Sequence, residues 1–322
     1  MGYEASRTHP NVVVDGSPNE ATVLTLTHWP GAGQPPFVSA DLSAEMVFRF
    51  LGLFRDQLTV DVVTNNHFDQ DGLVSVHVLV DDVGSAEHRD LLLDVAAAGD
   101  FATYRDRRAA RASMTISRMA ERAMRDGYGP SISDGLYVES LPLLIPMVLE
   151  GDRFRDDWAE EDAELEASEQ LIATGQVQID ERADVDLAVV TIPEAHRPAG
   201  GHRFAGKWAN GLHPMAVNNA TDHFRVLTVH GRHYELVDRY ETWVQYKSRR
   251  PLPRRDLRIV ADDLTSQESD GGRWEADAPS ELIPTLVSPG ESSLEADRVL
   301  RTIDHHLRVQ PSAWDPYDLS GS

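Results

Sequence analysis

The sequence contains no cysteine, only two lysines and no long hydrophobic segment. The absence of cysteine excludes disulfides and thiolate metal sites. No apolar run approaches the roughly 18 residues needed to cross a bilayer. The N-terminal residues Met1-Gly2-Tyr3-Glu4 lack the basic and apolar regions of a secretory signal. We therefore expect a cytoplasmic protein with no membrane partner.

Positive charge is scarce: 30 Lys and Arg stand against 53 Asp and Glu, which gives a net charge of −23. Phosphate backbones are bound by clustered Lys and Arg, so this balance disfavours a long nucleic acid as partner. Basic residues concentrate only in Arg249-Arg250 and Arg254-Arg255. An anionic ligand would find positive charge there, although such a cluster is also typical of a solvated loop.

The chain of 322 residues is long enough for two domains, or for one domain with a long elaboration. Residues 1–150 alternate strand and helix signals, with strands expected over 21–27 and 60–64, and predict an α/β domain with a parallel sheet. Residues 151–175 predict an acidic helical connector. Residues 176–322 predict a mixed α+β second domain that carries an accessory or substrate-binding role.

The segment 66–75 reads Asn-His-Phe-Asp-Gln-Asp-Gly-Leu-Val-Ser and joins a predicted strand to a predicted helix. His67, Asp69 and Asp71, at spacing two, offer one imidazole and two carboxylates to a single point, which suits one or two Mn²⁺ or Mg²⁺ ions. An Asp-x-Asp-Gly sequence is also an ordinary turn. A calcium loop is excluded, because the twelfth position counted from His67 is Val78 instead of Glu.

This segment resembles motif I of the DHH phosphoesterases, which carry D-x-D-x-D-G-x-x-S or H-x-x-x-D-x-D at this place. In the comparison His67 takes the place of the first acidic ligand, while four residues match directly: Asp69, Asp71, Gly72 and Ser75. The resemblance implies a three-layer N-terminal domain and metal-dependent hydrolysis of a phosphoester. It also implies a further ligand among small residues of a helix, for which Asp100 is the candidate.

Further site residues are expected outside the motif. Residues 200–206 (Gly-Gly-His-Arg-Phe-Ala-Gly) resemble the family's GGH-x-x-A-G substrate loop. His28 follows a predicted strand, as the motif does, so both are expected to face one crevice at the carboxyl ends of the strands. The predicted catalytic residues are His28 and His213, and the predicted substrate-binding residues are Asn66, Ser75, His202, Arg203 and Arg239. For Arg239 the alternative is an ion pair with one of the abundant carboxylates.

The triplet Asp304-His305-His306 looks like the signature that names the DHH family. It lies much further from Asp69 than the family pattern places it, and the apolar residues around it have helical spacing. We therefore interpret it as a chance triplet on a C-terminal helix.

These patterns favour a hydrolase of a small phosphoester or phosphoanhydride that depends on a divalent metal. One alternative is a degenerate DHH-like protein that binds metal or nucleotide without catalysis, and another is a structural protein whose Asp-Gly segment is only a turn. Convergence of about five carboxylates and imidazoles near Asp69 would favour the enzyme. The sequence has no G-x-S-x-G elbow, Walker loop or H-E-x-x-H motif, which argues against those enzyme classes.

Overall fold

The computed structural model describes residues 1–125, 130–196 and 211–318. Contacts divide the chain into two compact units. The first comprises residues 1–163 and 246–249, and the second comprises residues 164–245 and 250–322. The boundary between residues 163 and 164 falls inside the long acidic helix α9 (Arg155–Ala173). Each unit is described by itself.

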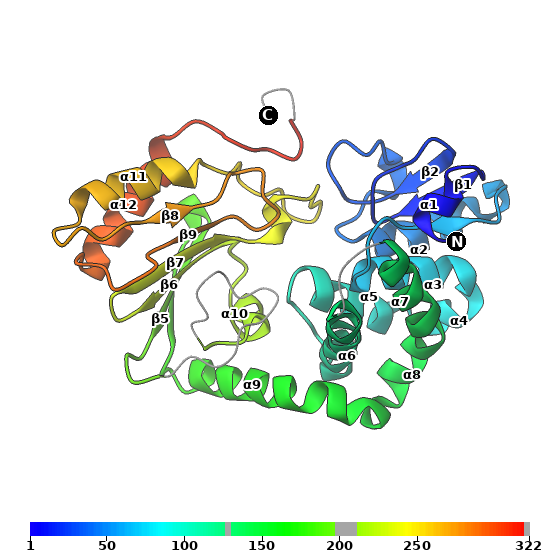
Figure 1. Ribbon diagram of the computed structural model, residues 1–322, viewed down its shortest axis with the longest axis horizontal. Coiled ribbons are helices and arrows are strands. Elements are labelled where there is room, and N and C mark those ends of the chain that lie inside the picture. Colours follow the sequence, from blue (N-terminus) through cyan, green and yellow to red (C-terminus); the bar gives the residue numbers. More distant parts are fainter. Residues whose placement is uncertain (126–129, 197–210, 319–322) are drawn as a thin grey trace. The chain divides into compact units, whose positions relative to one another are not determined.

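The first unit is built on a three-stranded parallel sheet in the order β2-β1-β3 (Figure 1). Its strands are β1 (Asn11–Val14), β2 (Thr22–Leu26) and β3 (Val63–Thr64). Val13 of the central strand pairs with Thr25 on one side and Thr64 on the other. The α/β class and the parallel sheet predicted for this half are confirmed. However, β1 was not among the expected strands, and β3 is shorter than the predicted 60–64.

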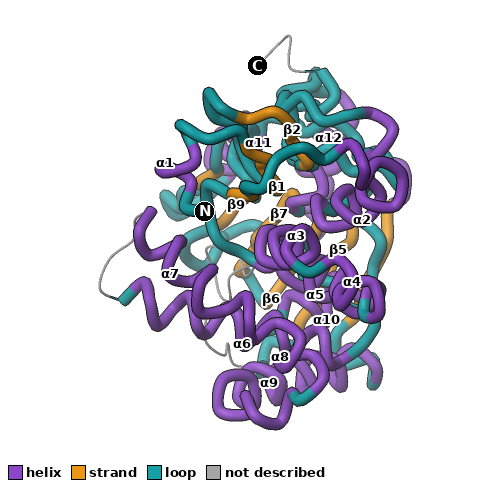
Figure 2. The backbone as a smooth tube through the Cα atoms, turned by 90° about the vertical axis from the view of Figure 1, so that its right-hand side faces the viewer, coloured by secondary structure: helices purple, strands orange, loops and turns teal. Residues whose placement is uncertain are grey.

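The described part of the first unit also contains α-helices. They are α1 (Tyr3–Ser6), α2 (Ser43–Phe54), α3 (Gln70–Val80), α4 (Asp82–Glu87), α5 (Arg89–Asp100), α6 (Arg107–Met124), α7 (Pro130–Ser140) and α8 (Leu144–Leu149). Both α2 and α3 pack on the sheet, and α5 packs on α3 (Figure 2). Because β1, Leu73 and Val74 are buried, the apolar core lies where α3 covers the sheet.

The small residues of α5 let it approach α3 closely, as their composition indicates. A Cβ atom on Gly99 would lie only 2.3 Å from Cβ of Gln70 on α3. No real side chain tolerates that separation, so a residue larger than glycine would push the two helices apart. Gly99 therefore sets the distance at which its neighbour Asp100 meets the residues of α3.

The second unit contains a six-stranded sheet in the order β4-β5-β6-β7-β9-β8. Its strands are β4 (Gln178–Arg182), β5 (Leu187–Ile192), β6 (Arg225–His230), β7 (His233–Asp238), β8 (Glu275–Ala276) and β9 (Thr285–Val287). Only β5 and β6 run parallel, and the other neighbours are antiparallel. The mixed α and β character predicted for this half is confirmed.

Helices cover both faces of this second sheet (Figure 1). One face packs its apolar residues against α11 (Leu257–Gln267) and α12 (Ala296–Val309). The other packs Val190 and Val226 against Val217 of α10 (Pro214–Ala220). Both faces of the central strands are therefore buried, as the almost fully buried β5 and β6 also indicate.

One apolar stretch of the first unit, Ile132–Leu149, is long and apolar enough to cross a membrane by length and composition. In the structure it is broken by a 3-10 turn at Leu141–Leu143, and its two helices, α7 and α8, pack on α6. Length and composition do not bear out the expectation that no segment could cross a bilayer, and only 33% of this stretch is buried. The cytoplasmic location expected from the sequence stays a prediction.

Candidate metal centre

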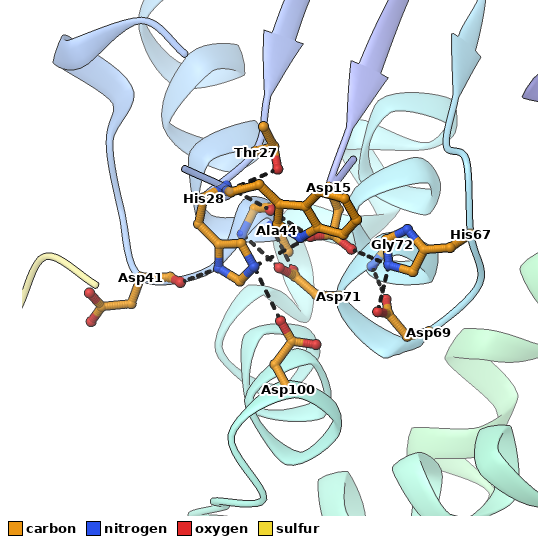
Figure 3. Close-up of polar contacts among 12 residues, drawn as sticks. Asp15, Thr27, His28, Asp41, Ala44, His67, Asp69, Asp71, Gly72 and Asp100 are labelled. Carbon is orange, nitrogen blue, oxygen red and sulfur yellow. Dashed lines mark hydrogen bonds and ion pairs between the residues drawn. The ribbon is translucent and has the colours of Figure 1, made fainter. Parts of the chain in front are cut away.

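The carboxyl ends of the three parallel strands converge on one group of polar side chains (Figure 3). Asp15 directly follows β1, His28 follows β2, and the segment with His67 and Asp69 follows β3. Parallel strands place their carboxyl ends at the same edge of a sheet, which is where α/β proteins bind ligands. The sheet therefore gathers residues that lie far apart in the sequence.

The first ligand cluster consists of Asp15, His28, Asp71 and Asp100, whose ligand atoms all lie within 4.8 Å of one another. Nε2 of His28 is 3.5 Å from Oδ1 of Asp15 and 3.5 Å from Oδ2 of Asp100. All four residues are buried, with exposed fractions from 0 to 3%. We call this group the buried cluster.

The second ligand cluster consists of Asp15, His67 and Asp69. Nε2 of His67 lies 2.7 Å from Oδ2 of Asp69 and 3.3 Å from Oδ2 of Asp15. The indole of Trp29 stacks on the His67 imidazole at a ring separation of 5.1 Å. His67 keeps 21% of its side chain exposed. We call this group the open cluster. Asp15 belongs to both clusters, and its two oxygens face different imidazoles.

Neighbouring backbone groups orient the buried cluster. Nδ1 of His28 donates to the carbonyl of Asp41 at 2.6 Å, which leaves Nε2 as the nitrogen available to a metal. The Asp41 carboxylate in turn accepts from the backbone N–H groups of Lys247 and Ser248. A carbonyl or carboxylate behind a ligating histidine is the usual outer partner in metal sites.

The N-terminus of α2 holds the Asp71 carboxylate. The N–H groups of Ser43 and Ala44 donate to its two oxygens at 2.7 and 2.8 Å. The Ser43 hydroxyl donates to Oδ1 of Asp15 at 2.8 Å. These N–H groups have no partner within their own helix, and the helix dipole favours negative charge at this end. The helix thus fixes two ligands of the buried cluster at once.

Burial and neighbouring charges shift the pKa values at the site in opposite directions. Burial lowers the pKa of His28, although Asp15 partly offsets it, so its imidazole is neutral as a metal ligand requires. Burial and the charge of Asp15 raise the pKa of Asp71 well above its ordinary value. For His67, burial opposes protonation, but Asp69 and Asp15 outweigh it and raise the imidazole pKa well above the usual range.

The chemistry of the donors fits a divalent cation. Asp15 and Asp71 are 1 and 0% exposed, and neither has an Arg or Lys within ion-pairing distance in the described part of the chain. Oδ2 of Asp15 is buried and accepts no hydrogen bond from a described residue. Buried carboxylates that face imidazoles but no Arg or Lys are costly. Cations held by both clusters would remove this cost, and carboxylates with imidazoles suit Mn²⁺ or Mg²⁺.

The structure brings together five of the residues proposed from the sequence. His67, Asp69, Asp71 and Asp100 lie in the two clusters as candidate ligands. His28, expected as a catalytic residue, also lies among the candidate ligands. Asp69 has a second task, because its Oδ1 accepts from the N–H of Gly72 and caps α3.

The remaining residues of the motif lie outside the two clusters. Oδ1 of Asn66 accepts from the N–H of Ser17 and so ties the turn after β1 to the turn after β3. Ser75 is fully buried within α3. Gly72 is the third residue of α3. A Cβ there would lie 2.4 Å from Nδ2 of Asn65 and 2.7 Å from the Tyr137 hydroxyl, so close approach is what requires glycine.

The other predicted residues lie outside the clusters. His213 belongs to the second unit, is buried, and caps α10 by accepting from the Met215 N–H. Arg239, also in the second unit, is buried and paired with Glu241, which is the alternative the sequence left open. His202 and Arg203 lie outside the described residues.

The triplet Asp304-His305-His306 lies on α12 of the second unit, as its helical spacing predicts. Nε2 of His306 is 2.8 Å from Asp263, and Asp304 pairs with Arg308. Neither of the two candidate clusters among the described residues includes the triplet.

Asp15 is the residue that sequence reasoning missed, although it connects both clusters. Its signal was present: the β-branched run Val12–Val14 ends in Asp15-Gly16. The same order, a β-branched run followed by acidic residues and glycine, identified the His67 segment. Asp15 also adopts a positive φ of 46°, a conformation in which Asp is enriched among non-glycine residues.

Comparison with known proteins adds a family and no named function. A protein-family model described as a family of unknown function, DUF6687, matches residues 1–318. The chain belongs to this family. No curated protein and no solved structure matches it.

Proposed function

We propose that this protein is a divalent-metal-dependent hydrolase of a small phosphoester or phosphoanhydride. The observation that carries the proposal is the pair of ligand clusters that share Asp15. Hydrolases of phosphoesters commonly hold two metal ions about 3.5–4 Å apart. A carboxylate whose two oxygens face two different imidazoles suits such a pair, because it can contribute one oxygen to each ion.

The residues divide naturally between two ions. His28, Asp71 and Asp100 would hold one ion, His67 and Asp69 the other, and Asp15 would contribute to both. Two bound cations would supply Lewis acidity toward a phosphoryl group and toward an attacking water. The protein's own part is to keep the ligands oriented, which the Asp41 carbonyl and the N-terminus of α2 do.

The ligand set agrees with the resemblance to DHH phosphoesterases in its size but not in its order along the chain. The two clusters contain six carboxylates and imidazoles, Asp69 included, which meets the number of about five expected of the enzyme. However, Asp15 and His28 precede the motif in the chain, whereas the resemblance implies ligands that follow it. The net charge of −23 favours a mono- or dinucleotide-sized substrate over a long nucleic acid.

Metal content and activity of the purified protein test the proposal together. Elemental mass spectrometry after loading with Mn²⁺ should find close to two ions per chain. The loaded protein should release product from small phosphodiesters, dinucleotides or pyrophosphate. Chelation should abolish turnover, and added Mn²⁺ should restore it.

Two outcomes would count against the proposal. If no metal were bound, even after incubation with Mn²⁺, a metal-dependent hydrolase would be excluded. Two bound ions without hydrolysis of any member of the substrate panel would instead leave a protein that binds metal without catalysis.

A further inference from the structure

A pocket of about 260 Å³ in the second unit is lined by three arginines. They are Arg225 at the start of β6, Arg255 just before α11 and Arg308 near the end of α12. Among the described residues that line the pocket, Asp184 is the only acidic one, and four are apolar or proline: Val185, Leu252, Pro253 and Leu307. In a chain with a net charge of −23, three guanidinium groups around one pocket are an unusual concentration.

Two of the three arginines are neutralised by carboxylates. Arg225 is 2% exposed; its Nε lies 3.1 Å from Asp238, and its other nitrogens donate to backbone carbonyls, including that of Val185. Arg308 pairs with Asp304 on its own helix and with Asp184 across the pocket. These two side chains line the pocket, but carboxylates already neutralise their charges.

Arg255 is different. Its Nε donates to the carbonyl of Leu307 at 3.2 Å, which fixes the guanidinium at the end of α12. Among the described residues, no carboxylate lies within ion-pairing distance of it, and its two terminal amino groups have no partner. Burial and the nearby charge of Arg225 lower the pKa of Arg255.

We propose that this pocket binds the phosphate group of a small anionic ligand, with Arg255 as its bidentate partner. A guanidinium whose Nε is anchored presents its two terminal amino groups in a fixed fork, which matches two oxygens of a phosphate. The volume exceeds that of a bare phosphate, and Val185 and Leu307 offer apolar contact to the remainder of a ligand. None of the six candidate metal ligands lines this pocket, so the two sites are independent.

Calorimetric titration of inorganic phosphate into the full-length, metal-free protein tests this directly. Removing the metals prevents phosphate from binding at the metal centre, so failure of the proposed function would not alter the result. Arg255→Gln should weaken phosphate binding at least tenfold, the order expected when a charged hydrogen-bonding partner is lost. Arg258→Gln is the matched control, because Arg258 lies nearby on α11 and pairs only with Asp256 among the described residues. It should change the affinity less than twofold.

Further variants keep the result interpretable. Arg255→Lys retains the charge but loses the fork, so it should fold normally and bind with intermediate affinity. Ribose 5-phosphate in place of phosphate separates two sources of the ligand: tighter binding indicates a phosphorylated metabolite, and equal binding indicates free phosphate. Absence of saturable binding in the wild type, or equal affinity in Arg255→Gln, would overturn the proposal.

Discussion

The buried and the open cluster use the same kinds of ligand but differ in how they are enclosed. The buried cluster has four ligands, all at most 3% exposed, and its His28 and Asp71 are fixed by backbone groups. The open cluster has three ligands, and its His67 is partly exposed beneath Trp29. Enclosure and outer partners strengthen metal binding, while open coordination positions admit water and substrate.

We expect the two clusters to have different roles within one metal centre. We expect the buried cluster to hold its ion tightly and to exchange it slowly. We expect the open cluster to bind more weakly and to be the side on which a substrate enters. Asp15, which faces both, is the point at which the two ions would influence each other.

The largest effect is expected from Asp15→Asn, because this change removes the one carboxylate that both clusters share. Asn adopts positive φ as readily as Asp, so the turn after β1 should survive. Mn²⁺ affinity should fall at both sites by on the order of 100-fold or more. Elemental mass spectrometry after dialysis measures the loss.

Asp90→Asn is the control for Asp15→Asn. Asp90 lies on α5, the helix that carries Asp100, but its side chain is 95% exposed. This variant should keep both metals. If Asp15→Asn kept a full complement of Mn²⁺ as well, the shared-ligand arrangement would be wrong.

A smaller, selective effect is expected when each cluster loses a ligand of its own. Asp100→Asn should abolish tight binding and spare the open cluster, whereas Asp69→Asn should remove one weakly bound ion. Asn still caps a helix, so the second change should leave α3 intact. Titration with Mn²⁺ monitored by electron paramagnetic resonance should show one remaining ion in each case. That ion should be bound weakly in Asp100→Asn and tightly in Asp69→Asn. Identical titrations for the two variants would contradict the difference between the clusters.

The site residues that the sequence revealed are mainly those that lie close together in the chain. His67, Asp69 and Asp71 lie on one turn between a strand and a helix, so their spacing alone brings them together. Asp100 was found less directly, through the small residues before it, and Gly99 shows why those residues matter. The α/β class followed from alternating strand and helix signals in the same way.

Asp15 was not predicted, because its place in the site depends on the strand order of the sheet. Parallel strands are usually joined by a crossover of a dozen or more residues, often a helix. Here only residues 15–21 separate β1 from β2, so although Val12–Val14 is a β-branched run, its distance from β2 gave no sign of a central parallel strand. Without that strand, no spacing rule connects Asp15 to His28 or His67. Residues 240–246 alternate aromatic and polar side chains, which predicts a strand. They form none, because Thr242 and Trp243 bond back to Arg239 and Tyr240 in a 3-10 turn.

The smallest effect, and the most specific to the open cluster, is expected from Tyr137→Phe. The Tyr137 hydroxyl donates to the carbonyl of His67 at 3.0 Å, and its ring packs edge-on against Phe68. Loss of the hydrogen bond should lower the free energy of unfolding by about 1 kcal/mol. Because the bond holds the backbone that carries His67, Mn²⁺ binding at the open cluster should weaken several-fold, while tight binding at the buried cluster stays unchanged.

Val138→Ala is the matched control for Tyr137→Phe, since Val138 is the next residue of α7 and is 77% exposed. It should alter neither Mn²⁺ site. A merely structural role for Tyr137 would lower stability and leave both Mn²⁺ affinities as they are. Weakening at both clusters by the same factor would mean that the turn after β3 and the buried ligands move together. The two clusters would then be a single mechanical unit, and the distinction between a tight and an exchangeable ion would have to be abandoned.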